Sequence, residues 1–156
     1  MFAHLNSIGL YGMDAFEVNV EADISNGLPG FDVVGLPDTA VKESRDRVRS
    51  ALKNCGFTFP MSRITVNLAP ADKRKEGPIY DLPILLAILT ASGQLSCDLS
   101  DCAMIGELSL SGEIHGIRGV LPMAIHAKEL GYHRLFVPAV NAAEGAVVEG
   151  LEVYPV

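Results

Sequence analysis

The residues best suited to chemistry in this 156-residue chain are its lysines and arginines, which gather in one stretch. Nine of the twelve lie between residues 42 and 75 among only three acids, so this stretch carries a local charge of +6. The net charge of the whole chain is −7, and the rest of it therefore carries −13. Because phosphate binding depends on local potential, residues 42–75 are the candidate surface for a polyanion.

One group of these cations falls on a predicted helix at residues 39–55, which begins after Asp38 and ends at Gly56. Apolar side chains recur there at three- and four-residue steps. At 100° per residue, four cations lie within about 60° of one another beside that apolar stripe. We call them the basic ridge: Lys42, Arg45, Arg49 and Lys53. Such a ridge can follow a phosphate backbone, pair with an acidic neighbouring subunit, or form the solvated side of a helix.

A second group of cations lies in the loop after an alternating strand that starts at Arg63 and ends before Pro70. This group comprises Lys73, Arg74 and Lys75. The loop leads to Asp81, which we expect to cap the next helix, and residues 82–89 are all apolar, so that helix should be buried. No aromatic residues interleave with the basic ridge, so stacking of single-stranded bases is not expected.

Other sites for chemistry find little support in the sequence. The four histidines have no cysteine or carboxylate at ligand spacing, so no metal site is predicted. Glu107 and Glu113 flank a turn and indicate a charged hairpin rim. The cysteines are an odd set without C-x-x-C spacing and are expected to be free, mostly buried thiols: Cys55, Cys97 and Cys102.

The length of 156 residues fits a single domain, and the hydropathy of the sequence predicts no membrane-spanning segment. Its longest apolar run, residues 82–89, is far shorter than the roughly 20 residues of a membrane span. The N-terminus lacks the basic start and apolar core of a signal peptide, so a cytoplasmic location is expected.

The order of predicted elements indicates an α/β fold of the α+β type, with helices packed on one face of a mixed sheet. The chain should open with an antiparallel meander. Predicted strands lie at residues 2–10, 15–24, 31–34, 63–68, 103–110, 113–117, 134–137 and 151–154, and predicted helices at 39–55, 82–91, 120–130 and 141–146.

Two stretches resemble the N-terminal domain of the ComM/YifB family of magnesium-chelatase-like AAA+ ATPases. They read NGLPGFDVVGLPDTAVKESRDRVRSALKN from Asn26 and RITVNLAPADKRKEGPIYDLPILL from Arg63. The resemblance implies a Lon-protease-like fold of the ribosomal-protein-S5 domain 2 type over residues 1–156, excised from a larger protein. That parent would be a ring-forming, hexameric DNA helicase for branch migration in natural transformation and recombination.

Lon-like domains suggest a Ser–Lys peptidase, and the resemblance allows a check by position. Glu76, Gly77 and Pro78 match the string before the Lon nucleophile, but Ile79 stands where the serine is expected and Leu121 where the lysine is expected. The chain also lacks the G-x-x-x-x-G-K-[ST] loop, so ATP and Mg²⁺ would bind elsewhere in the parent.

The sequence therefore predicts a domain without its own enzymatic activity, cofactor, small-molecule substrate or membrane contact. Its expected role is DNA contact through the basic ridge and the loop cations. Two alternatives remain open: a purely structural oligomerisation collar, in which the ridge meets an acidic neighbour, and a residual Ser/Lys peptidase.

Overall fold

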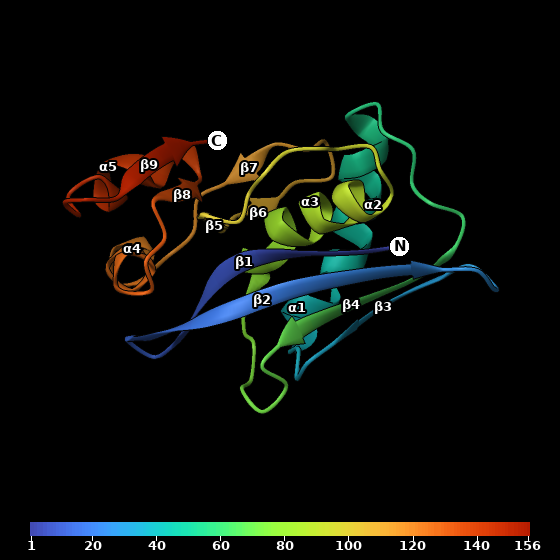
Figure 1. Ribbon diagram of the computed structural model, residues 1–156, viewed down its shortest axis with the longest axis horizontal. Helices are drawn as coiled ribbons and strands as arrows, with labels where there is room; N and C mark the ends of the chain where they lie inside the picture. The colour runs from blue at the N-terminus through green and yellow to red at the C-terminus, as the bar shows by residue number, and fades with distance from the viewer.

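The computed structural model describes all residues 1–156 and gathers most strands into one mixed, seven-stranded sheet (Figure 1). The strand order is β3-β4-β2-β1-β5-β8-β9, and β6 and β7 form a separate hairpin. The strands are β1 (Phe2–Tyr11), β2 (Asp14–Ser25), β3 (Gly30–Val34), β4 (Arg63–Ala69), β5 (Cys102–Met104), β6 (Glu107–Leu108), β7 (Ile114–His115), β8 (Arg134–Val137) and β9 (Glu152–Pro155).

The helices fall where the sequence predicts them, with shorter bounds except for α3, which begins one residue earlier, at Asp81. The expected helix at 39–55 is divided at Glu43, and the expected strand at 103–110 is divided into β5 and β6. The helices are α1 (Thr39–Lys42), α2 (Ser44–Asn54), α3 (Asp81–Ala91), α4 (Val120–Glu129) and α5 (Ala142–Gly145), with 3₁₀ turns η1 (Pro78–Tyr80) and η2 (Ala139–Asn141).

The predicted antiparallel meander is correct for its first hairpin and wrong for its third strand. β1 and β2 pair antiparallel, but β4 inserts between β2 and β3, and β3 pairs with β4 in parallel. A parallel pair needs a long crossover connection, which α1 and α2 provide between β3 and β4. This arrangement leaves β3 at one edge of the sheet and buries the apolar stripe of α2.

The mixed α/β sheet confirms the predicted fold class, but its helices do not all lie on one face. In β5, Cys102 and Met104 join the core shared with α2 and α3, whereas Ala103 joins a second core with Met123 of α4. Successive residues of a strand point to opposite faces. The one-face expectation therefore holds for α2 and α3 and is wrong for α4.

Candidate nucleic-acid interface

The basic ridge is exposed along its whole length. Asp38 caps α1 as predicted, since its Oδ1 accepts from the Val41 amide at 2.8 Å. The division of the helix at Glu43 does not remove any ridge residue from the surface, because Val48 and Leu52 keep the opposite side of α2 buried. None of the four ridge cations takes part in an ion pair. Their charges are therefore free to meet an external anion.

Two hollows follow the edge strand β3 beside the ridge. The hollow at the Val34 end is lined by Lys42 and Arg45 together with Asp32, Arg63 and Thr65. The hollow at the Gly30 end is lined by Arg49, Lys53, Phe59 and Met61. Two of the four ridge cations therefore line each hollow. We call the two together the β3 trough.

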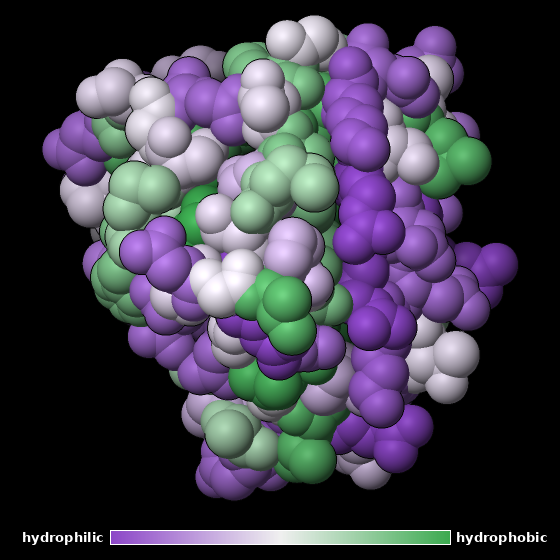
Figure 2. All heavy atoms as spheres, turned by 90° about the vertical axis from the view of Figure 1, so that its right-hand side faces the viewer, coloured by the Kyte–Doolittle hydropathy of each residue, from purple (hydrophilic) through white to green (hydrophobic).

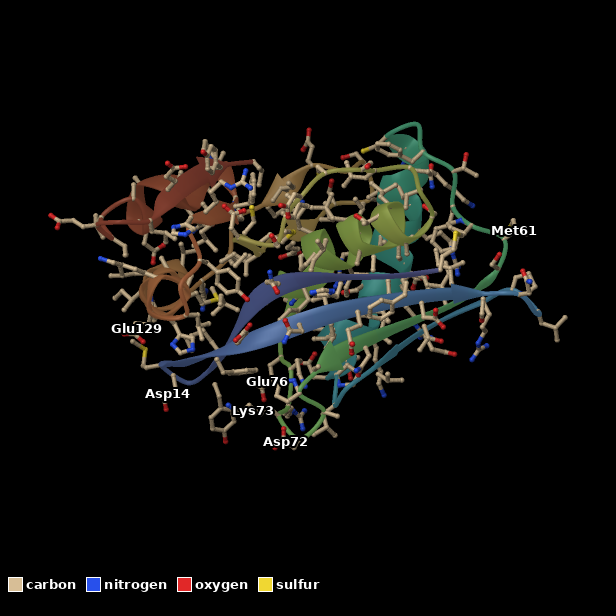
Figure 3. The ribbon with its side chains drawn as sticks, viewed as in Figure 1. Asp14, Met61, Asp72, Lys73, Glu76 and Glu129 are labelled. Carbon is tan, nitrogen blue, oxygen red and sulfur yellow. The ribbon has the colours of Figure 1, made fainter.

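The face that carries the Met61 end of the trough is strongly polar. Figure 2 shows a continuous band of hydrophilic side chains running from the top to the bottom of this face, beside scattered apolar groups. Met61, which is 81% exposed, marks the same end of the molecule in Figure 3. A polyanion would therefore meet an extended polar surface here.

Two residues beside the ridge were missed by the sequence reasoning. The Arg49 guanidinium lies 5.1 Å from the centroid of the Phe59 ring, so the expectation that no aromatic accompanies the ridge is wrong. Arg63 enters the trough from β4 and forms an ion pair with Asp32. No local pattern signals either residue, because the connection from α2 to β4 brings Phe59 back to Arg49, and β3–β4 pairing places Arg63 in the trough.

Lys75 does not lie on the surface that its neighbours suggest. It is completely buried, and its Nζ donates to the backbone oxygens of Pro70 and, at 2.8 Å, Gly35. Gly35 has a φ of 102°, and a Cβ there would lie 2.3 Å from the Leu68 oxygen. Burial lowers the pKa of Lys75. Lys75 therefore donates hydrogen bonds to loop carbonyl groups, and we exclude it from the proposed contact surface.

The other two loop cations form a separate site. Lys73 Nζ lies 5.0 Å from the Phe16 ring centroid, and Arg74 Nε pairs with Glu76 at 3.2 Å. Both cations line a hollow with Tyr11. Figure 3 shows Lys73 below the sheet, well separated from Met61. The predicted cations therefore divide into an unpaired ridge and a partly neutralised loop.

Asp81 does not cap α3 as expected, because it is the first residue of that helix and is fully buried. Its carboxylate accepts from Arg47 Nε at 2.6 Å, from Arg47 Nη2 at 3.0 Å, from the Ser44 hydroxyl and from the Leu108 amide at 3.0 Å. The hydrogen bond to Asp81 raises the pKa of Arg47. This network joins α2, α3 and β6, and it keeps Arg47 away from the ridge.

The positions that resemble a Lon active site lie in and just before η1 and at the start of α4. Ile79 in η1 packs against both cores, and the second core includes Val120, which precedes Leu121. The Leu121 amide donates to Glu144 at 3.1 Å, and Glu76 pairs with Arg74. Next to Ile79, the Tyr80 hydroxyl is buried without a partner, and burial raises the pKa of this phenol. Gly77 directly precedes η1, and Pro78 is its first residue.

Two further expectations concern cysteines and metals. Cys102 is buried, but Cys55 and Cys97 are exposed, so the prediction of mostly buried thiols is wrong for two of the three. All three are free. No group of three or more His, Cys, Asp or Glu side chains is arranged to hold a metal ion. No helix combines the length and apolar character needed to cross a bilayer.

Comparison with known proteins supports the motifs described above. YifB of Salmonella typhimurium is 49% identical over 138 residues, which are 88% of this chain and 27% of YifB. The competence protein ComM of Haemophilus influenzae is 47% identical over 144 residues, 92% of this chain and 28% of ComM. Lon protease of Leptospira interrogans is 27% identical over 125 residues, 78% of this chain and 15% of that protease.

The chain thus spans less than a third of the length of its curated relatives YifB and ComM. The more distant match to Lon protease is consistent with the Lon-like fold class. A family model described as subunit ChlI of Mg-chelatase matches residues 20–141. Because that match covers most of the chain, this protein belongs to the ChlI magnesium-chelatase-like family, together with its relatives YifB and ComM.

Proposed function

We propose that this chain is a non-catalytic domain of a ComM-like AAA+ ATPase and that it contacts DNA through the basic ridge. The observation that carries the proposal is the row of four exposed cations without ion-pair partners beside the β3 trough. Phosphates are the natural partners of such a row, since each neutralised phosphate releases condensed counterions. Lys73 and Arg74 are secondary contacts, because Arg74 is paired with Glu76 and Lys73 lies over the Phe16 ring.

The activity of the whole parent is part of the same proposal. The relative in Haemophilus influenzae is named a competence protein. A parent of this kind would be a hexameric helicase that drives branch migration in recombination, with ATP and Mg²⁺ held outside this domain. The residues of this chain do not fit a magnesium site, since no group of three or more His, Cys, Asp or Glu side chains converges. No step is therefore assigned to a metal here.

The proposal that the domain lacks peptidase activity rests on side-chain chemistry. Ile79 has no hydroxyl to act as a nucleophile, and Leu121 has no amine to act as a base. The nearby Tyr80 is buried, and its raised pKa keeps the phenol protonated. Turnover of a peptide substrate that a serine-directed reagent abolishes would contradict this part of the proposal.

A binding titration with fluorescent single-stranded, duplex and forked DNA tests the contact. The double variant Arg45→Glu/Arg49→Glu should weaken binding and reduce the slope of log K against log salt by about 1.4 to 1.8, because two phosphate contacts are lost. Arg118→Glu/Lys128→Glu makes the same change of charge at exposed cations outside the ridge and should retain the slope. Equal loss in both variants, or no salt-dependent binding, would refute the proposed contact.

The structural collar predicts a different result for the same variants. If the ridge meets an acidic neighbour, charge reversal should change the sedimentation of the full-length protein and leave DNA binding per subunit unaltered. DNA contact predicts the reverse. Sedimentation over a range of protein and salt concentrations therefore separates the two roles.

A further inference from the structure

The free edge of β3 offers backbone hydrogen bonds inside the β3 trough. The Gly30 amide donates to the Ser62 oxygen, and Gly30 pairs with Arg63 in a parallel register. In a parallel ladder, alternate residues direct both their N–H and C=O groups to the same neighbour. The backbone N–H and C=O groups of Gly30, Asp32 and Val34 therefore face β4. Those of Phe31 and Val33 face away from the sheet. The structure records no hydrogen-bond partner for the outward amides.

The opposite edge of the sheet is protected, and β3 is not. In β9, the backbone amides of Glu152 and Val156 donate toward β8. The backbone groups of Val153 and Pro155 therefore face away from the sheet. Pro155 has no N–H, and proline on an edge strand prevents another strand from adding. β3 contains no proline and no bulge in its register with β4. Only this edge presents a regular set of outward donors and acceptors.

The ridge determines which strand fits beside β3. Side chains of an added strand would alternate between the helix side, which carries Lys42, Arg45 and Arg49, and the open side, which carries Arg63. Alternate residues of a strand repeat about every 6.6 Å, and three- to four-residue steps on a helix repeat about every 4.5 to 6 Å. Carboxylates at every second position would therefore come close to successive ridge cations, whereas lysines there would be repelled.

We propose that the free edge of β3 binds an extended acidic polypeptide segment by strand addition, with its carboxylates against the basic ridge. Main-chain hydrogen bonds to Phe31 and Val33 provide the affinity, and the cations select acidic partners. This inference goes beyond the DNA contact. The bound segment and DNA would both occupy the ridge, so each would exclude the other.

The test uses an eight-residue, capped, fluorescent peptide that alternates threonine and glutamate, titrated into the 156-residue chain by anisotropy. Two further peptides carry N-methyl groups on one or the other alternate set of amides. Only one set faces β3, so one methylated peptide should bind at least about tenfold more weakly while the other retains affinity. Equal affinities or equal losses in the two methylated peptides would overturn strand addition.

Charge and position are tested with matched variants. Arg45→Glu should weaken peptide binding about tenfold or more, Arg118→Glu should leave it unchanged, and a threonine–lysine peptide should not bind. Amide hydrogen exchange measured by NMR should slow at Phe31 and Val33 when peptide is added and stay the same at Asp32, which already faces β4. Exchange unchanged at Phe31 and Val33 would refute the assigned site.

The outcomes separate this inference from the DNA contact. Binding of DNA without binding of the peptide would refute strand addition and leave the proposed function standing. Peptide binding without DNA binding would support strand addition and refute the DNA contact. Slow exchange at Phe31 and Val33 in a self-associated protein without peptide would show that a second copy, and not an acidic segment, is the occupant.

Discussion

Replacing Asp81 with asparagine tests whether the buried network at the start of α3 holds the ridge helix in place. The carboxylate accepts four hydrogen bonds, from Arg47 twice, from Ser44 and from the Leu108 amide. Asparagine has nearly the same volume but no charge, and its amide group turns one acceptor into a donor. The variant therefore leaves the Arg47 guanidinium, whose side chain is only 17% exposed, with the exposed Glu43 carboxylate, 3.6 Å from Nη1, as its remaining ion-pair partner.

The expected loss follows from the burial of the pair. Removing one partner of a buried ion pair costs about 3 to 5 kcal/mol, mainly because the other charge stays buried. Arg47 retains some contact with water, its exposed ion pair with Glu43 and a hydrogen bond to the Ala40 oxygen at 2.8 Å, so we expect the lower end, about 3 kcal/mol. For a domain of this size, that loss lowers Tm by about 6 to 12 °C.

Urea unfolding of the wild type, Asp81→Leu, Arg47→Met and the double variant measures the coupling, alongside Asp81→Asn. Paired removal leaves no uncompensated charge, so the double variant should be more stable than the sum of the single losses predicts, by about 2 kcal/mol. A loss below about 1 kcal/mol for Asp81→Asn, or strictly additive single losses, would refute the reasoning.

Two other side chains carry predictions that urea unfolding at several pH values checks. Lys75→Met should cost about 1 to 3 kcal/mol, because the Gly35 and Pro70 oxygens lose their donor. Burial lowers the pKa of Lys75, so the unfolded chain binds this proton more tightly. The wild type should therefore gain stability relative to Lys75→Met as pH rises through the folded pKa toward about 10.4, and a constant difference would contradict this. Tyr80→Phe should stabilise by about 1 kcal/mol, since it removes a buried hydroxyl without a partner. Folded Tyr80 keeps its proton above its ordinary pKa near 10, so the wild type loses stability above that pH and the advantage of Tyr80→Phe should widen; a shrinking advantage would contradict the burial argument.

Local patterns in the sequence were sufficient for several features of this protein. The 3.6-residue period places the four ridge cations on one exposed side of α1 and α2, and Asp38 caps α1 as its position predicts. An uninterrupted apolar run predicts the burial of α3. These predictions succeed because neighbours in the sequence determine them.

Tertiary structure alone decided which charged groups are available. Lys75 and Arg74 are adjacent in a basic loop, yet only contacts with Gly35 and Pro70 make Lys75 internal. The position of Asp81 in the sequence predicts a helix cap, but in the structure its carboxylate pairs with Arg47, which is 34 residues away. The connection from α2 to β4 places Phe59 against Arg49 of the ridge, and the insertion of β4 between β2 and β3 leaves β3 as an open strand edge. Pairing between distant segments leaves no periodic trace in the sequence, so it could be read only from the folded chain.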